Sequence, residues 1–205
     1  MSGDEPTRSL EVERSYDVGD DAVVPDWSLL PGVAAVGGAE VRELDARYLD
    51  TADLTLGRAG IALRRRTGGP DEGWHVKIAA AEGRHEYHWP LGDEALPAGI
   101  AEALAPWAEP PFTPLARIRN RRVAYALTDA AGHVVAEMVD DHVTATDERT
   151  GRAQRWREWE VELGPAAPAD AAAREAFFAA VEALVADAGG RPAASDSKLA
   201  RTLGR

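Results

Sequence analysis

The stretch Ser9-Leu10-Glu11-Val12-Glu13-Arg14-Ser15-Tyr16 alternates between two kinds of side chain, as a β-strand with two different faces does. One face carries the bulkier side chains, Leu10, Val12, Arg14 and Tyr16. The other face carries the small or acidic ones, Ser9, Glu11, Glu13 and Ser15. Two carboxylates on the same strand face repel each other unless water or a cation lies between them. A single Glu-x-Glu pair is typical of a solvated face, so its meaning depends on the other strands.

Charged side chains alternate in the same way on later segments. The basic alternations are Arg64 with Arg66, His75 with Lys77, and Arg117 with Arg119 and Arg121. The acidic alternation on the last predicted strand consists of Glu158, Glu160 and Glu162. The two signs of charge are therefore segregated. Carboxylates lie on the first and last strands, and Arg and Lys lie on the strands between them.

The predicted architecture is α+β and mostly β. Roughly eight strands, mostly joined by tight turns, predict a closed or nearly closed antiparallel barrel with flanking α-helices. The predicted strands cover residues 9–16, 40–49, 61–67, 74–78, 84–89, 115–127, 133–143 and 154–163, with a break expected at the acidic pair Asp140-Asp141. Helical segments are expected near 27–30, 54–59 and 100–105, from Asp170 onward, and after a cap at Ser195. We expect residues 1–205 to form a single domain.

The composition excludes several classes of protein. A net charge of −12 argues against a general nucleic-acid binder, although an acidic chain can carry a concentrated basic site. Cysteine is absent, which excludes disulfides, a thiolate nucleophile and cysteine-ligated metals. The first residues lack a signal pattern and no apolar run approaches membrane-spanning length, so we expect a cytoplasmic protein without membrane association. The oligomeric state stays open.

The charged strand faces allow two architectures. Either they face solvent over an apolar core, or they line a wet interior while the apolar faces pack beneath helices. The segregation of sign favours the wet interior. Arg and Lys bind phosphate oxygens through charge-assisted hydrogen bonds, and paired carboxylates suit Mg²⁺ or Mn²⁺. Such an interior would suit a polyanion together with its divalent cation.

Several short segments, in order along nearly the whole chain, resemble the CYTH domain family, also called triphosphate tunnel metalloenzymes. They are Glu11-Val-Glu13, Tyr48-Leu-Asp-Thr-Ala-Asp-Leu54, Gly60-Ile-Ala-Leu-Arg-Arg-Arg-Thr-Gly68, Trp74-His-Val-Lys77, Arg117-Ile-Arg119, Glu158-Trp-Glu-Val-Glu162 and Ser197-Lys-Leu-Ala-Arg201. The resemblance implies an eight-stranded antiparallel tunnel. It also implies that this tunnel binds triphosphate or polyphosphate-type substrates with a divalent metal and commonly hydrolyses them.

The resemblance also implies residue roles. The phosphate-binding residues would be Arg64, Arg66, Lys77, Arg117 and Arg119, with Lys198 from the final helix and Arg84 and Arg121 as further candidates. The metal ligands would be Glu11, Glu13, Glu158, Glu160 and Glu162, of which Glu11, Glu13 and Glu160 would also be catalytic. Glu137 and Asp141 share strand parity and would complete the acidic end. Lys198 fits a surface helix position equally well, and His75 is a candidate ligand contact.

One position departs from the family pattern. The family's opening motif is Glu-x-Glu-x-Lys, and this chain has Ser15 where the lysine would stand. Arg14 does not replace that lysine, because adjacent strand residues point to opposite sides. The leading hypothesis is metal-assisted hydrolysis of a terminal phosphoanhydride by a water that a carboxylate orients. The alternatives are a polyphosphate- or nucleotide-binding module with little turnover and an adenylate cyclase-like enzyme.

Overall fold

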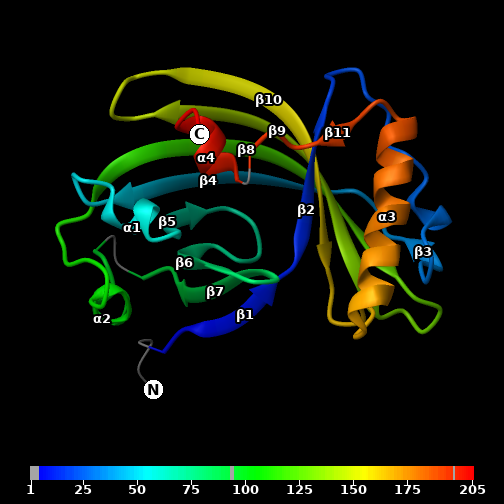
Figure 1. Ribbon diagram of the computed structural model, residues 1–205, viewed down its shortest axis with the longest axis horizontal. Helices are drawn as coiled ribbons and strands as arrows, with labels where there is room; N and C mark the ends of the chain where they lie inside the picture. The colour runs from blue at the N-terminus through cyan, green and yellow to red at the C-terminus, as the bar shows by residue number, and fades with distance from the viewer. Residues whose placement is uncertain (1–4, 93–94, 196) are drawn as a thin grey trace.

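The computed structural model describes residues 5–92, 95–195 and 197–205. Within these ranges, antiparallel strands form one strongly curled sheet, with helices α1 (Thr55–Arg58), α2 (Ala98–Leu104) and α3 (Ala171–Asp187) on its outside (Figure 1). The strands are β1 (Thr7–Glu11), β2 (Glu13–Val18), β3 (Ala35–Val36), β4 (Glu40–Asp50), β5 (Ile61–Thr67), β6 (Gly73–Ala80), β7 (Gly83–Pro90), β8 (Thr113–Thr128), β9 (Val134–Asp147), β10 (Ala153–Leu163) and β11 (Arg191–Pro192). The other helices of these ranges are η1 (Trp27–Leu29) and α4 (Lys198–Thr202).

The N-terminal stretch joins the two ends of this sheet. Strand β1 pairs with β7 and strand β2 pairs with β10, although only Val12 separates β1 from β2 in the chain. The strand order in the sheet is β1-β7-β6-β5-β4-β8-β9-β10-β2-β11. Strands β1 and β2, which are consecutive in the chain, therefore lie at or near opposite ends of this order. At the junction, the Val12 carbonyl oxygen accepts a hydrogen bond of 2.9 Å from the Leu163 amide. This pairing curls the sheet into a tunnel.

The predicted fold class is confirmed, with a different strand count. The predicted first strand is divided into β1 and β2, and the two-residue strands β3 and β11 were not expected. Strand β9 also runs unbroken through Asp140 and Asp141, so the predicted break there is wrong. The Asp140 carboxylate binds Arg157 on the outside, and the Asp141 carboxylate binds Arg122 on the inside. Both acids are satisfied within the sheet and do not end the strand.

The helices cover apolar outer faces of the sheet. Helix α3 buries Phe177 and Phe178 in a cluster that includes Trp159. Helices α1 and α2 cover β5, β6 and β7 through a second cluster, which contains Leu63 and Trp74. Helix α3 begins at Ala171, next to Asp170 as expected, and Asp170 is its cap. The cap of α4 is Ser197, so the prediction of Ser195 is wrong. Across the described ranges no helix combines the length and apolar character needed to span a membrane.

The outer faces thus supply most of the apolar core, and the inner face is left for charged groups. A smaller apolar cluster does lie on the inner wall of β4, β8, β9 and β10, where Ala46, Ile118 and Trp156 meet Leu199 of α4. Helix α4 packs against this wall between the two sides of the curled sheet (Figure 1). The interior is therefore apolar where α4 packs and polar elsewhere.

A glycine at the closing junction provides a test of the tunnel. Gly83 has φ +113°, and an added Cβ would lie 2.0 Å from the Glu11 carbonyl oxygen. Gly132, in the β8–β9 turn, has φ +83° with nothing within 4 Å of an added Cβ. In both variants the alanine backbone is strained, because φ is positive at the substituted position. Only in Gly83→Ala must the new methyl group also push β1 away from β7. We expect Gly83→Ala to be less stable than Gly132→Ala by about 2 kcal/mol or more in urea unfolding. Equal stability of the two variants would contradict the closed junction.

Candidate functional site

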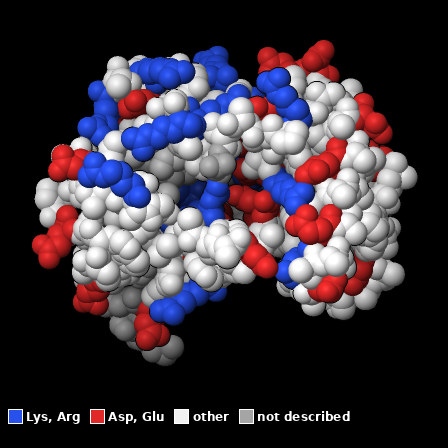
Figure 2. Space-filling model, in the orientation of Figure 1, with Lys and Arg blue, Asp and Glu red and all other residues white. Residues whose placement is uncertain are grey.

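The inside of the tunnel contains a cavity of about 390 Å³. In the space-filling view a hollow opens near the middle of the molecule, with basic and acidic side chains next to each other inside it (Figure 2). Most of the predicted site residues line this cavity, namely Glu11, Glu13, Arg64, Arg66, Lys77, Glu160, Glu162 and Lys198. The wet interior proposed from the alternation of charge is therefore present.

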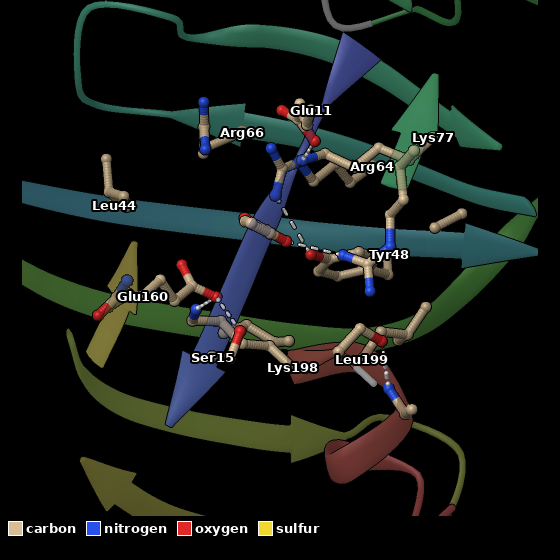
Figure 3. Close-up of a pocket in the computed structure, with 18 of the residues that line it drawn as sticks. Glu11, Ser15, Leu44, Tyr48, Arg64, Arg66, Lys77, Glu160, Lys198 and Leu199 are labelled. Atoms are coloured by element: carbon tan, nitrogen blue, oxygen red, sulfur yellow. Dashed lines mark hydrogen bonds and ion pairs between the residues drawn. The ribbon is translucent and has the colours of Figure 1, made fainter. Parts of the chain in front are cut away.

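The basic wall of the cavity comes from β5 and β6. Arg64 and Arg66 point inward because they alternate with outward side chains such as Leu63, and Lys77 lies on the neighbouring strand (Figure 3). The Lys77 ammonium is 2.5 Å from the Glu11 carboxylate. The Arg66 guanidinium pairs with Asp71. Burial, with the nearby charge of Arg64, lowers the pKa of Arg66 to about 9.

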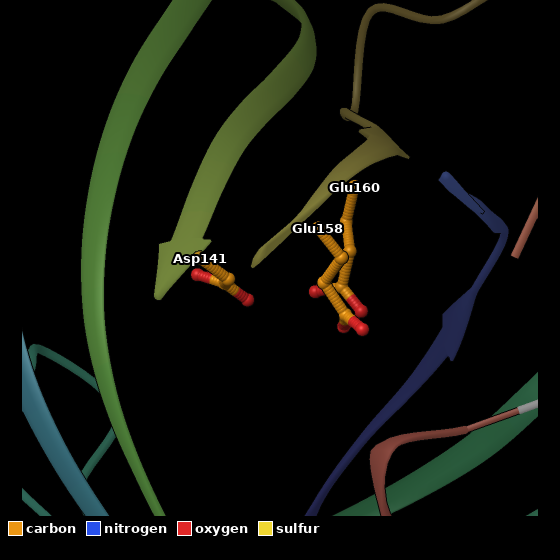
Figure 4. A group of neighbouring side chains, drawn as sticks. All are labelled: Asp141, Glu158 and Glu160. Carbon is orange, nitrogen blue, oxygen red and sulfur yellow. The ribbon is translucent and has the colours of Figure 1, made fainter. Parts of the chain in front are cut away.

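The acidic wall comes from β9 and β10, and of its three clustered carboxylates Glu160 lines the cavity, whereas Asp141 and Glu158 are buried and do not line it. Carboxylate oxygens of Asp141, Glu158 and Glu160 lie within 4.8 Å of one another (Figure 4). The Lys198 ammonium lies among them, at 2.9 Å from Asp141, 2.5 Å from Glu158 and 2.6 Å from Glu160. Arg122 reaches the same group, at 2.7 Å from Asp141 and 2.8 Å from Glu160.

The two cations decide the ionisation of this acidic group. Burial opposes charge on Asp141, but Lys198 and Arg122 outweigh it and hold the pKa of that carboxyl below its usual range. The pKa of Glu160 is also lowered, since Lys198 overcomes its burial. Burial dominates at Glu158 and raises its pKa. The site therefore presents two firmly ionised carboxylates and a third that is harder to ionise.

These side chains fit a divalent metal. Buried carboxylates are the ligands that hard cations such as Mg²⁺ and Mn²⁺ prefer. Asp141, Glu158 and Glu160 already surround one cationic group, the Lys198 ammonium. Two of the predicted ligands, Glu158 and Glu160, thus come together with Asp141.

The other predicted ligands gather at the seam where β1 and β2 meet β10. Burial, reinforced by Glu11 and Glu13, raises the pKa of Glu162 to about 8. Burial also raises the pKa of Glu11 and of Glu13. Arg84 donates a hydrogen bond of 3.0 Å to Glu13, and the Ser15 hydroxyl lies 3.3 Å from Glu160. This end of the cavity is rich in carboxylates that resist ionisation together.

Two predicted phosphate-binding residues do not reach the cavity. Arg117 and Arg119 lie on the outer face of β8, where both pair with Asp45, and the Arg119 side chain is 60% exposed. The inward residues of β8 are Ile118, Asn120 and Arg122. The prediction of Arg117 and Arg119 as cavity residues is wrong, because the alternating arginines of this strand occupy the opposite face. Arg121, the further candidate on that strand, is also on the outer face.

Sequence reasoning missed Arg122 and Glu86. A signal for Arg122 was available, because counting back from the hairpin turn at Asp129 places Arg122 opposite the acidic pair that includes Asp141. Glu86 shares a strand face with Arg84, and it lies 3.5 Å from both Arg64 and Lys77. His75, expected as a possible ligand contact, is fully buried behind the basic wall and does not line the cavity.

The raised pKa of Glu162 makes the stability of the tunnel depend on pH. The folded protein holds this proton up to about pH 8, whereas an ordinary glutamate loses it near 4.5. The stabilisation is therefore complete below about pH 4.5 and is lost as the pH rises through about 8. The wild type should lose unfolding free energy between pH 5 and 9. We expect Glu162→Gln to lose about 2 kcal/mol less than the wild type over this range in urea titrations. Glu102→Gln, on the exposed surface of α2, is the control, and equal pH slopes in all three proteins would contradict the assignment.

Three comparisons place the chain among known proteins. The fold is similar to an adenylate cyclase candidate from Bacillus halodurans, with a TM-score of 0.66 and 15% identity over 95% of this chain and 97% of that one. It is also similar to an adenylyl cyclase candidate from Hippeastrum, described as having a dominant triphosphatase activity, with a TM-score of 0.55 and 16% identity over 95% and 96% of the two chains. At these identities the likeness concerns the fold.

Sequence relatives give a more direct assignment. Uncharacterized protein Rv2226 of Mycobacterium tuberculosis is 38% identical over 213 residues, which is 97% of this chain and 41% of that protein. The chain therefore spans less than half the length of the curated relatives that it matches. The profile of the CYTH domain matches residues 28–187, a segment that contains both the basic and the acidic wall of the cavity. The chain belongs to the CYTH domain family.

Proposed function

We propose that this chain hydrolyses a terminal phosphoanhydride of inorganic triphosphate or a similarly compact triphosphate, with Mg²⁺ or Mn²⁺. The observation that carries the proposal is the cavity itself, in which a basic wall faces the same space as Glu160, one member of a cluster of three buried carboxylates. A phosphate chain needs the basic wall, and its divalent cation needs the carboxylates. The CYTH domain family, which depends on divalent metals and binds triphosphate substrates, supports the same function.

The basic wall would bind the phosphates. Arg64, Arg66 and Lys77 come from neighbouring strands and so present their charges along one side of the cavity. Each forms an ion pair with a carboxylate: Arg64 with Glu86, Arg66 with Asp71 and Lys77 with Glu11. Phosphate oxygens would replace these partners and accept the same charge-assisted hydrogen bonds. Lys198 and Arg122 would contact the substrate from the opposite wall.

The carboxylates would hold the metal and the attacking water. Asp141, Glu158 and Glu160 would be ligands, and Glu11, Glu13 and Glu162 would complete the acidic end. A bound Mg²⁺ or Mn²⁺ supplies charge neutralisation at the phosphoryl oxygens. Glu13 accepts a proton more readily than an ordinary glutamate, because burial and Glu160 raise its pKa. Glu11 and Glu162 also have raised pKa values. Of the three we assign Glu13 to orient the water and take its proton, because Glu160, a proposed metal ligand, is the nearby charge that contributes most to its shift.

A second candidate is a module that binds triphosphate or polyphosphate with little turnover. The observation that favours it is Ser15, an uncharged side chain whose hydroxyl contacts Glu160 at the acidic end of the cavity. A missing cation there would leave less charge to stabilise a transferring phosphoryl group. Tight calorimetric binding of triphosphate by a folded protein that releases no phosphate would select this candidate.

Phosphate release from inorganic triphosphate is the first test of hydrolysis. We expect release that depends on Mg²⁺ or Mn²⁺ and that falls about 100-fold or more in Glu160→Gln, because the variant removes a carboxylate from the metal cluster. Glu102→Gln, on the surface of α2, should retain full activity. Release from the wild-type protein no faster than from Glu160→Gln, with both proteins folded, would overturn the triphosphatase proposal.

A matched pair of arginines tests which side of the sheet binds phosphate. Arg66 lines the cavity, whereas Arg119 lies on the outer face of the tunnel. We expect Arg66→Ala to raise KM for triphosphate about 10-fold or more, since a charge-assisted hydrogen bond contributes roughly 1.5–3 kcal/mol. Arg119→Ala should change KM less than about twofold. The reverse order of effects would show that the substrate binds outside the cavity.

A further inference from the structure

His75 lies behind the basic wall, where none of its surface is exposed. It belongs to β6, two residues before Lys77 and opposite Arg64 of β5. The ring of His88 contacts it at a tilt of 42°, with the ring centroids 4.8 Å apart. A fully buried histidine is retained at low cost only if its ring nitrogens find hydrogen-bonding partners. Those partners connect His75 to the cavity.

One ring nitrogen contacts the carboxylate that holds two of the cavity cations. His75 Nδ1 is 2.7 Å from Glu86 Oε1. The same oxygen is 3.5 Å from Arg64 Nη2 and 3.5 Å from Lys77 Nζ. This oxygen is therefore a contact that both cations share, although Lys77 also pairs with Glu11 and Arg64 also donates a hydrogen bond to Tyr48. Since Glu86 is itself nearly buried, the contact with His75 fixes its orientation.

The other ring nitrogen contacts the loop that holds the third cation. His75 Nε2 is 3.1 Å from the Asp71 carbonyl oxygen. Arg66 donates a hydrogen bond of 3.3 Å to that same oxygen, and its guanidinium also pairs with the Asp71 carboxylate. One buried ring thus lies against two acceptor atoms, and with a single N–H it can donate a hydrogen bond to only one of them.

The ring is neutral in the free protein. Burial lowers the pKa of His75, and the electrostatic effects of Arg64, Arg66, His88 and Lys77 lower it further. A neutral imidazole has a single N–H. We assign this hydrogen to Nδ1, because the contact with the Glu86 carboxylate is the shorter of the two and is charge-assisted. His75 therefore orients Glu86 without adding positive charge to the wall.

We propose that His75 is a positioning residue of the triphosphate site, which holds Arg64 and Lys77 in one arrangement by donating a hydrogen bond from Nδ1 to Glu86. This inference rests on the proposed function for its ligand. Guanidinium and ammonium groups on long side chains lose conformational entropy when they bind an anion. Side chains that are already held in place have lost this entropy on folding, so their binding to the anion costs less. His75 contributes to binding in this way without touching the substrate.

The two lysines of the chain make a direct test possible. Lys77 and Lys198 are the only lysines in the sequence, so reductive methylation with ¹³C gives one dimethyl-lysine NMR signal for each, and Lys198→Arg identifies which is which. We compare His75→Ala with His75→Asn, whose amide N–H replaces Nδ1. The control is His133→Ala, since that side chain is 71% exposed. The binding probe is inorganic triphosphate, titrated calorimetrically with EDTA to prevent metal-dependent turnover.

We expect His75→Ala to move the Lys77 signal, to leave the Lys198 signal in place and to weaken triphosphate binding about 10-fold or more. His75→Asn should stay close to the wild type, as should His133→Ala. An unchanged Lys77 signal with unchanged affinity in His75→Ala would overturn the inference, and so would equal movement of both lysine signals, which indicates general loosening. If the wild type fails to bind triphosphate with EDTA and also releases no phosphate from it with Mg²⁺ or Mn²⁺, while the Lys77 signal still moves, the proposed function falls and the positioning of the wall by His75 stands.

Discussion

The tunnel depends on the pairing of opposite charges in a space where water cannot screen them fully. A buried charge without a partner costs several kcal/mol, so a cavity wall made of Arg and Lys is stable only beside carboxylates. The chain meets this constraint by drawing its two signs of charge from different parts of the sheet. Strands β5 and β6 supply Arg64, Arg66 and Lys77, and strands β9 and β10 supply Asp141, Glu158 and Glu160. Most of the apolar core therefore lies on the outer face of the sheet, under α1, α2 and α3.

This pairing also relates the free protein to a bound one. The charges of each wall pair with side chains of the other sign. Lys198 lies among the carboxylates, and Glu11 pairs with Lys77. A polyanion accompanied by a divalent cation offers both walls a replacement partner at once. A polyanion alone would replace the partners of the basic wall and leave the displaced carboxylates unpaired. The architecture therefore favours a ligand that carries both signs of charge.

The sequence predicted the parts of the site that lie on short strands between tight turns. For β5 and β6, the two-residue alternation placed Arg64, Arg66 and Lys77 correctly, because the apolar residues of the opposite face mark the outside. Strand β8 has charged residues on both faces, so the alternation of Arg117 with Arg119 did not distinguish inside from outside. The inner face of β8 is identified only by its register with β4 and β9, which depends on turns and on pairing across the sheet. The His75 connections likewise join strands that no local pattern relates.

The closure of the tunnel by β1 and β2 has a consequence for folding. Glu13 pairs with Glu162 of β10, so β1 and β2, which are synthesised before β4 to β9, must wait for β10 before the seam can form. Contacts between residues so distant in sequence are slow to form, because most of the entropy of loop closure is lost before they contribute. Until β10 is complete, the chain can form the β5–β6–β7 meander and the β8–β9 hairpin, but it cannot form the cavity. The cavity is thus one of the last features to be completed, and a partly synthesised chain has no means of enclosing a ligand.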